Sequence, residues 1–240
     1  MNANLRAVDA AKLSEKLKAA SPAAIVAEAL RVVGKARLAV ASSFGTESAT
    51  LLKIVADVDP FIPVLFLDTG WLFPETIAYR DTLVARLGLT DVRTIAPAAD
   101  ALAVKDPSRD LWATDPDACC YLRKVEPLGD ALRGFDAWIN GRKRYQGGMR
   151  ANIPAVEVEG ARLKFNPLAR VTPREIVQMF NGWNLPRHPL AGQGFTSLGC
   201  MPCTRRTNPG DNARAGRWAE SEKTECGIHN RMPLVDGAGI

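Results

Sequence analysis

The sequence predicts an α/β fold in which a mostly parallel sheet is flanked by helices. Two short apolar stretches, 38–41 and 62–67, each run into a small polar loop that is followed by a segment of helical periodicity. The second stretch is almost continuously apolar, as is typical of a parallel strand buried on both faces. Strands that alternate with helices in this way predict a parallel sheet with helices on both sides.

Two helices are predicted before the first strand, over residues 9–20 and 22–33. Ser21-Pro22 supplies an N-cap followed by proline at the first helical position, and Gly34 follows the last turn of the second helix. These signals predict where the second helix begins and ends.

The elements after the second strand follow the same alternation as far as the middle of the chain. A capping box, Thr172-Pro173-Arg174-Glu175, predicts a further helix near the C-terminal third. The stretch after the fourth strand predicts an irregular excursion. The expected elements are a helix over 74–88, strands over 92–95 and 135–140, a helix from Cys119 toward Leu132, irregular chain over 153–160, and a helix from Pro173 to about Trp183.

Length and composition suit one large domain with an appendage. The chain has 240 residues, and its hydrophobic content of 47% is enough for a sizeable core. Beyond Thr207 the sequence is polar and rich in glycine and arginine. We therefore predict an α/β domain over residues 1–207 and a mobile C-terminal segment over 208–240.

The net charge of +5, from 31 basic and 26 acidic residues, suits either nucleic acid or a small anionic substrate. The cations gather in segments that also contain the cysteines, and no basic helix with interleaved aromatic residues is present. The distribution favours a small anion, and we expect no nucleic-acid partner.

No stretch supplies the ~20 consecutive apolar residues that a membrane helix needs, so we expect no membrane association. The first 18 residues carry charges throughout and lack the apolar region of a secretory signal. We therefore expect a cytoplasmic protein, whose clustered thiols serve metal binding or catalysis more often than disulfides.

Two loops at the ends of the first two strands are candidate ligand-binding elements. Ser42-Ser43-Phe44-Gly45-Thr46 precedes a helix that starts near Glu47, which is the geometry that binds a phosphate, or simply an ordinary capped turn. Asp68-Thr69-Gly70 follows the second strand, at the edge where open α/β sheets bind ligands. An aspartate that only caps its own loop is the alternative.

The five cysteines form two couples and one single residue. Cys119-Cys120 and Cys200-Met201-Pro202-Cys203 together supply four thiols, which suit zinc or an iron–sulfur cluster, with unliganded core cysteines as the third possibility. Adjacent side chains diverge, which suits a cluster with separate iron corners better than one small ion. Cys226 remains as a free thiol near His229, one of two histidines.

Five motifs occur together and in the order seen in the assimilatory sulfonucleotide reductases. They are Ser42-Ser43-Phe44-Gly45, Leu67-Asp68-Thr69-Gly70, Cys119-Cys120, Cys200-x-x-Cys203 and Glu225-Cys226-Gly227-Ile228-His229. The chain resembles the thioredoxin-dependent, iron–sulfur-containing branch of the APS/PAPS reductase family, where APS is adenosine 5′-phosphosulfate (adenylyl sulfate) and PAPS its 3′-phosphorylated form. The match extends, in separate motifs, over residues 37–232.

The resemblance implies an adenine-nucleotide α-hydrolase-like, Rossmann-like fold, in which residues 1–207 form a nucleotide-binding reductase domain that carries the iron–sulfur site. The Ser-Gly-Gly-x-Asp-Ser loop of the related ATP pyrophosphatases is altered here over residues 42–48. Where the family often has an acidic residue, glutamine and serine after its paired basic residues, this chain has Tyr145-Gln146-Gly147 after Arg144.

The family roles carry over onto matching positions. The resemblance implies a [4Fe–4S] cluster on Cys119, Cys120, Cys200 and Cys203, and a nucleophile at Cys226. It implies substrate contacts from the first loop, from the second loop and from basic positions, namely Ser42, Ser43, Phe44, Gly45, Thr46, Glu47, Ser48, Asp68, Thr69, Gly70, Lys124, Arg142, Arg144, Arg214, Arg217 and His229.

The reaction implied by the resemblance is reduction of APS to sulfite and AMP in assimilatory sulfate reduction and cysteine biosynthesis. The Cys226 thiolate attacks the sulfate sulfur, an S-sulfocysteine forms, and reduced thioredoxin then releases sulfite. The basic residues offset the repulsion between thiolate and phosphosulfate. His229 holds the substrate or lowers the thiol pKa, and substrate contact is favoured.

Two other functions compete with this one. An ATP-dependent sulfurtransferase or pyrophosphatase of the same fold is disfavoured by the altered loop and the single cysteine near the C-terminus. A zinc-clipped nucleic-acid-binding module comes from a different class. The helix over 9–20 offers a contact for a second subunit in a homo-oligomer, although a solvated amphipathic face is its default role.

Overall fold

The computed structural model describes residues 3–229, with side chains described from Asp9 onward. Its sheet has the strand order β3-β2-β1-β4-β6-β5, and every neighbouring pair is parallel except β5 and β6. The described strands are β1 (Leu38–Ser42), β2 (Val64–Leu67), β3 (Val92–Ile95), β4 (Ala137–Ile139), β5 (Val156–Glu159) and β6 (Arg162–Phe165). The predicted mostly parallel α/β fold is therefore confirmed.

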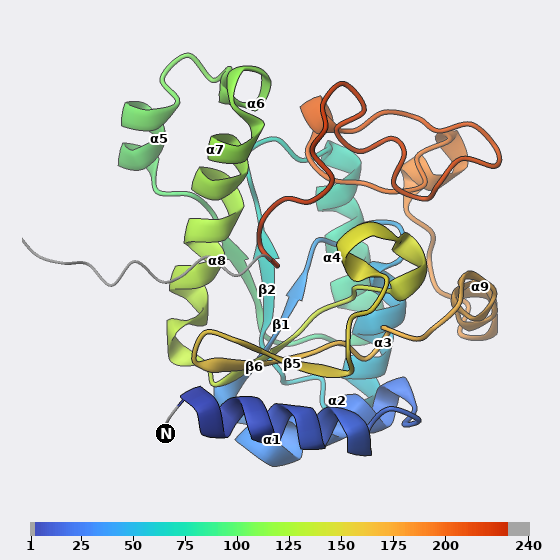
Figure 1. Ribbon diagram of the computed structural model, residues 1–240. Helices are drawn as coiled ribbons and strands as arrows, with labels where there is room; N and C mark the ends of the chain where they lie inside the picture. Colours follow the sequence, from blue (N-terminus) through green and yellow to red (C-terminus); the bar gives the residue numbers. More distant parts are fainter. Residues whose placement is uncertain (1–2, 230–240) are drawn as a thin grey trace, which may run out of the picture.

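Helices cover both faces of this sheet and extend beyond its carboxyl end (Figure 1). Between β3 and β4 the chain forms a run of short helices, which includes the π-helical turn η2 (Tyr121–Val125). The helices are α1 (Ala3–Lys16), α2 (Pro22–Val33), α3 (Ser48–Val58), α4 (Pro74–Leu87), α5 (Ala99–Lys105), α6 (Leu111–Thr114), α7 (Pro116–Cys120), α8 (Glu126–Ala131) and α9 (Pro173–Gly182).

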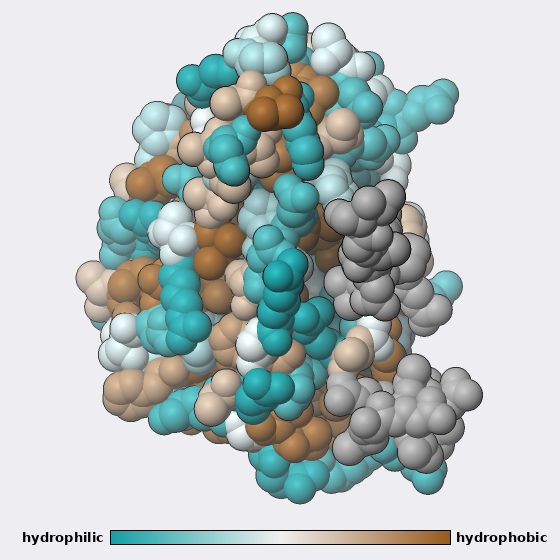
Figure 2. All heavy atoms as spheres, turned by 90° about the vertical axis from the view of Figure 1, so that its left-hand side faces the viewer, coloured by the Kyte–Doolittle hydropathy of each residue, from teal (hydrophilic) through white to brown (hydrophobic). Residues whose placement is uncertain are grey.

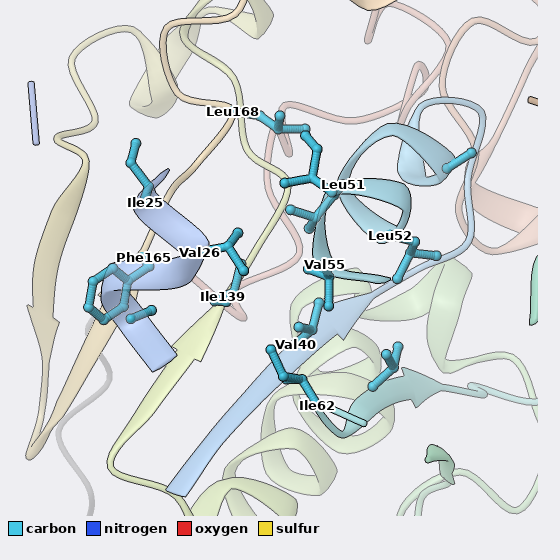
Figure 3. Packing of buried hydrophobic residues seen from close by; sticks show 14 of the residues in the cluster. Ile25, Val26, Val40, Leu51, Leu52, Val55, Ile62, Ile139, Phe165 and Leu168 are labelled. Atoms are coloured by element: carbon cyan, nitrogen blue, oxygen red, sulfur yellow. The ribbon is translucent and has the colours of Figure 1, made fainter. Parts of the chain in front are cut away.

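Alternating side chains of the buried strands build two apolar clusters on opposite faces. On one face, Val40, Ile139 and Phe165 pack with Ile25 and Val26 of α2 and with side chains of α3 (Figure 3). On the other face, Ala39, Leu65 and Trp138 pack with Leu128 and Leu132. Because successive strand residues point to opposite sides, one apolar run supplies both clusters.

The helix ends follow the local signals in the sequence. Ser21 Oγ accepts a hydrogen bond from Ala24 N at 3.2 Å, with Pro22 at the first helical position of α2. The capping box at the start of α9 forms, because Thr172 Oγ1 accepts from Glu175 N and the Glu175 carboxylate accepts from Thr172 N. These predictions are confirmed. The first helix ends at Lys16 rather than near residue 20.

Two predicted elements need correction. Within the stretch predicted as irregular, residues 156–159 form β5, which pairs with β6 in a hairpin that turns at Gly160 with φ +57°. The alternation of valine and glutamate in β5 was the available signal. The helix that carries Cys119 and Cys120 begins at Pro116, where the Asp115 side chain accepts from two backbone N–H groups and caps α7.

The edge strand β5 is covered by α1, and Val156 N donates to Ser14 Oγ at 3.4 Å. A covered edge does not offer its backbone to another chain. On the face of the molecule that carries α5 and α8, hydrophobic side chains are interspersed with hydrophilic ones (Figure 2). Among the helices of residues 3–229, none combines the length and apolar character needed to cross a membrane.

Candidate functional site

The candidate site is a cavity of about 210 Å³ at the carboxyl ends of β1, β2 and β4. Here the strand order reverses, because β1 has β2 on one side and β4 on the other. Open α/β sheets bind ligands in the crevice at such a switch point. Of the residues singled out in the sequence, the cavity lining includes Ser42, Ser43, Gly45, Thr46, Glu47, Ser48, Thr69, Lys124, Arg142, Arg214, Arg217, Cys200, Cys226 and His229.

The first predicted loop passes from β1 to α3 with a sharp turn at Phe44, whose φ is +47°. Ser42 Oγ accepts from Phe44 N at 3.2 Å, and the Phe44 ring is fully buried with its edge against Phe66. The Phe44 side chain therefore belongs to the core, and the predicted substrate contact of Phe44 stays a prediction. The turn leaves Ser43, Gly45 and the start of α3 facing the cavity.

The second predicted loop contributes only Thr69 to the cavity. Asp68 accepts a hydrogen bond from Gly70 N at 2.9 Å, so its carboxylate caps its own turn. Asp68 and Gly70 instead line a separate hollow beside α5. Asp68 therefore caps its own loop, as the alternative interpretation expected, and the substrate contacts of Asp68 and Gly70 stay predictions.

The predicted basic residues converge on the cavity with one exception. Lys124, Arg142, Arg214 and Arg217 line it, whereas Arg144 lines a different hollow next to α1. Arg144 Nε donates to Ile153 O at 2.9 Å. The chain turns into η4 (Arg144–Gln146) at this point, which points the Arg144 side chain away from the site. Arg144 therefore lies outside the cavity, and its substrate contact stays a prediction.

Two cationic residues were missed in the sequence. Lys143 and Arg150 both line the cavity. Lys143 Nζ lies 2.8 Å from the Glu47 carboxylate, which connects it to the first loop. Lys143 lies within a visible basic run, but Arg150 follows Gly147-Gly148-Met149 and carries no sequence signal of its own. Only the tertiary structure brings it to the site.

The site concentrates positive charge in a partly dehydrated space. Burial and the neighbouring Arg150 lower the pKa of both Arg142 and Arg214 to about 10. Both guanidinium groups still carry their charge at neutral pH. Cations held in place in a low-dielectric cavity stabilise anions more strongly than cations in water.

The four paired cysteines lie close together at one side of the cavity. Cys119, Cys120 and Cys200 are buried, and Cys203 is half-buried. Burial, with the charges of Cys120 and Cys200, raises the pKa of Cys119 to about 12, and burial raises the pKa of Cys120 to about 11. Burial likewise raises the pKa of Cys203. Burial therefore disfavours the thiolate forms of these three cysteines unless a positively charged partner is bound.

Cys200 differs from the other three. Burial alone would raise its pKa, but Lys124, the Thr69 hydroxyl and Arg217 bring it below the ordinary value. Thr69 Oγ1 lies 3.2 Å from Cys200 Sγ. Burial alone would lower the pKa of Lys124, but its interactions with Cys200, Cys226 and Cys120 raise it above the ordinary value.

Within residues 3–229, no group of three or more histidine, cysteine, aspartate or glutamate side chains is arranged to hold a metal ion. A four-iron cluster makes a different demand, since its ligands are thiolates spread over the cluster. Cys119, Cys120 and Cys200 are buried and Cys203 is half-buried, and their four thiols would supply that donor set.

The segment after Thr207 is packed onto the cysteine loop. Arg205 N donates to Gly216 O at 2.7 Å, and Trp218 N donates to Cys203 O at 3.1 Å. The Trp218 side chain is buried and receives the cations of Arg214, Arg217, Lys124 and Lys223 at 4.5–6.0 Å from its ring centre. Trp218 is therefore the residue at which this segment packs into the body of the protein.

These contacts cross the boundary predicted at residue 207. The segment over 208–229 (red in Figure 1) passes above the sheet and returns toward β2 and α8. Its predicted mobility stays a prediction, and residues 230–240 of the predicted segment lie outside the described residues.

The predicted nucleophile and the predicted histidine both face the cavity. Cys226 is partly exposed, and the His229 ring lies parallel to the Trp138 ring, with 5.6 Å between their centroids and 3° between their planes. Burial, together with Lys164, Arg142, Arg150 and Arg214, lowers the pKa of His229 well below its ordinary value. A neutral imidazole does not act as the cation that lowers the thiol pKa, and the substrate contact of His229 stays a prediction.

The chain is similar to known proteins over most of its length. A family model, the phosphoadenosine phosphosulfate reductase domain, matches residues 37–206. An adenosine 5′-phosphosulfate reductase of Mesorhizobium japonicum is 46% identical over 208 residues, which cover 87% of this chain and 82% of the relative. A phosphoadenosine 5′-phosphosulfate reductase of Gloeobacter violaceus is 40% identical over 216 residues, which cover 87% of this chain and 88% of the relative.

A solved structure supports the fold. The phosphoadenylyl-sulfate reductase of Candida auris, in a phosphate complex, superimposes with a TM-score of 0.69 at 23% identity, covering 81% of this chain and 95% of the other. With a family model over more than half of its length and relatives at 40% identity or more, this chain belongs to the phosphoadenosine phosphosulfate reductase family.

Proposed function

We propose that this protein reduces adenosine 5′-phosphosulfate to sulfite and AMP through an S-sulfocysteine on Cys226. The carrying observation is that Cys226 shares one cavity with the first loop and with Lys124, Arg142, Arg214 and Arg217. A lone nucleophile, a nucleotide-binding switch point and a cluster of cations suit attack on an anionic activated sulfate. The relatives named as APS reductases and as PAPS reductases support this class of reaction.

The first step is a displacement at sulfur. The Cys226 thiolate forms an S–S bond to the sulfate sulfur, the bond from that sulfur to the bridging oxygen breaks, and AMP leaves with the electron pair. Arg142, Arg214, Arg217 and Lys124 are positioned to offset the charge on the phosphosulfate and on the leaving phosphate. The neutral His229 contributes a hydrogen bond to the substrate rather than a charge.

The second step needs an external dithiol, for which we propose reduced thioredoxin. One of its thiolates attacks Cys226 Sγ, sulfite leaves, and a mixed disulfide forms. The second thiol of the donor then releases Cys226 and leaves as a disulfide. The dithiol supplies both electrons of the reduction. The five free cysteines fit a reducing compartment, and we place the protein in the cytoplasm.

We further propose that Cys119, Cys120, Cys200 and Cys203 hold a [4Fe–4S] cluster. When bound, the cluster would supply a fixed structural and electrostatic element next to the substrate cavity. Lys124 would lie between the cluster ligands and Cys226, since it interacts with Cys200, Cys120 and Cys226. Iron and acid-labile sulfide in about equal amounts are expected in protein purified without air, and protein with full activity but no iron would contradict the cluster.

The function is tested by measuring sulfite and AMP from APS with reduced thioredoxin as donor. We expect stoichiometric sulfite and AMP, and much slower turnover with the 3′-phosphorylated substrate. Pyrophosphate release from ATP, with no sulfite from APS, would instead support the ATP pyrophosphatase alternative. Comparing turnover of APS with turnover of PAPS also distinguishes the two activities for which the relatives are named.

Gly199 is expected to be required for activity rather than for folding. In this structure Arg217 Nη1 donates to Leu198 O at 2.9 Å. A Cβ atom at position 199 would lie 2.1 Å from Arg217 Nη2, so the guanidinium could not stay in this place. In a Gly199→Ala variant the flexible guanidinium moves away and leaves the cavity. We expect a KM for APS raised at least about tenfold, the scale of one lost charge-assisted contact, with little change in the thermal unfolding midpoint. Gly182→Ala, where no atom lies within 4 Å of the new Cβ, is the control.

A further inference from the structure

The residues on either side of Cys226 are held more firmly than Cys226 itself. In residues 3–229 the Cys226 sulfur has no hydrogen-bond partner. Its neighbour Glu225 makes a two-point ion pair with Arg150, from Nε to Oε1 at 2.5 Å and from Nη2 to Oε2 at 2.8 Å. Both side chains are only 10% exposed. Glu225 also lies 3.4 Å from Arg214 Nη2.

A second anchor holds the chain three residues later. His229 stacks on Trp138, which is fully buried in β4 and donates from Nε1 to the Glu159 carboxylate at 2.9 Å. Ile228 packs against the apolar cluster that contains Trp138. Between the two anchors the chain turns at Gly227, whose φ is +89°.

The first anchor is itself fixed to the nucleotide side of the site. Arg150 lies in η5 (Gly148–Arg150) and donates from Nη1 to the Gln146 side chain. Gln146 Nε2 in turn lies 3.5 Å from the Glu47 carboxylate, in the loop between β1 and α3. Arg150 therefore connects the segment that carries the thiol to the loop that faces the nucleotide cavity.

We propose that Glu225 is a positioning residue, and that its ion pair with Arg150, together with the stacking of His229 on Trp138, sets the Cys226 sulfur at the cavity. This inference rests on the proposed function. Its physical reason is that a thiolate attacks only from a narrow range of positions, so that a misplacement of about 1 Å costs ~10²-fold in rate. Because the Cys226 sulfur makes no hydrogen bond within residues 3–229 and only interacts electrostatically with neighbours such as Lys124, the two flanking anchors supply that precision.

Replacing Glu225 by glutamine tests the proposal, because a purely electrostatic role and a positioning role predict opposite effects on the reaction rate. A carboxylate among cations that bind an anion should weaken substrate binding, so its removal frees Arg150 and Arg214 and tightens the binding of AMP or APS. If Glu225 acted only through its charge, a Glu225→Gln variant would therefore be as fast or faster. If Glu225 positions the thiol, the same variant binds at least as well but reacts more slowly.

The experiment uses the full chain with its metal content intact. Single-turnover sulfonation of Cys226 by saturating APS without reductant is followed by intact-protein mass spectrometry, and alkylation of Cys226 by iodoacetamide is followed by peptide mass spectrometry in the presence of AMP. For Glu225→Gln we expect sulfonation ~10- to 100-fold slower, alkylation several-fold faster, and AMP affinity equal or tighter. Glu225→Asp, which keeps the charge, should recover part of the sulfonation rate.

The matched control is Glu220→Gln, the same chemical change at an exposed ion pair with Arg205 on the same segment. It should leave both rates unchanged. Sulfonation and alkylation rates in Glu225→Gln equal to those of the wild type would overturn the positioning role. Absence of sulfonation in the wild type would instead refute the proposed function, and the alkylation rates would still report whether Glu225 holds the thiol in place.

Discussion

A Cys226→Ser variant is expected to lose sulfite formation from APS almost completely. The serine hydroxyl is a far weaker nucleophile at neutral pH, and burial together with neighbouring cations lowers the pKa of His229, which makes that imidazole a weak base for activating it. Deleting the nucleophile removes the covalent route, which typically costs ~10³-fold or more. The measurement is sulfite release with reduced thioredoxin at saturating APS.

Binding should survive this change. Cys226 is partly exposed at the wall of the cavity, and serine occupies slightly less volume, so AMP affinity and the unfolding midpoint should stay close to those of the wild type. Mass spectrometry of wild-type protein mixed with APS alone should locate one SO₃ group on Cys226 and none in the variant. A serine variant that still forms sulfite would remove Cys226 from the mechanism.

An Asp106→Asn variant is expected to lose ~3–5 kcal/mol of unfolding free energy, because it leaves the Arg123 guanidinium buried without its counter-ion. The two side chains are 0% and 4% exposed, and Arg123 Nη1 also donates to Thr69 O at 2.9 Å. Such a loss is a large fraction of the ~5–15 kcal/mol typical of a folded domain. Urea unfolding at pH 7 measures it.

The difference in unfolding free energy between wild type and Asp106→Asn should shrink only toward acidic pH. Burial alone would raise the pKa of Asp106, but hydrogen bonds from Arg123 and from the Leu111 backbone bring it below the ordinary value. A carboxylate whose folded pKa is lowered stabilises the protein above its unfolded pKa, near ~3.9, and loses that contribution as pH falls through the folded pKa. The difference between wild type and variant should therefore be constant near neutrality and shrink below about pH 4.

Two further variants separate this pair from a general effect of charge. Asp130→Asn removes the acidic partner of an exposed ion pair, in which the Asp130 side chain is 59% and the Arg133 side chain 79% exposed. This variant should change the free energy of unfolding by less than ~1 kcal/mol. Asp106→Asn combined with Arg123→Met should recover much of the loss, since no unpaired charge remains in the interior. Equal losses in the single and the double variant would contradict a buried ion pair as the cause.

The candidate site was predictable wherever chemistry is tied to local sequence. Cys226 is the cysteine that neither couple includes, and the loop at Ser42–Ser48 follows an apolar strand directly, so both were found without knowledge of the fold. Asp68 and Arg144 show the limit of that approach. Each stands next to a residue that faces the cavity, but backbone turns point Asp68 into its own loop and Arg144 toward Ile153.

Patterns over a few neighbouring positions were enough to predict the alternation of strands and helices, the ends of α2 and α9, and which cysteines form couples and which stands alone. These features depend on periodicity, capping chemistry and residue type, which are local. The tertiary structure alone decided that Arg150 pairs with Glu225, that His229 stacks on Trp138, and that Trp218 is buried against the cysteine loop. These pairs are separated by up to 91 positions (229 minus 138). Contacts at that range arise from packing onto a common sheet, which leaves no periodic signal in either segment.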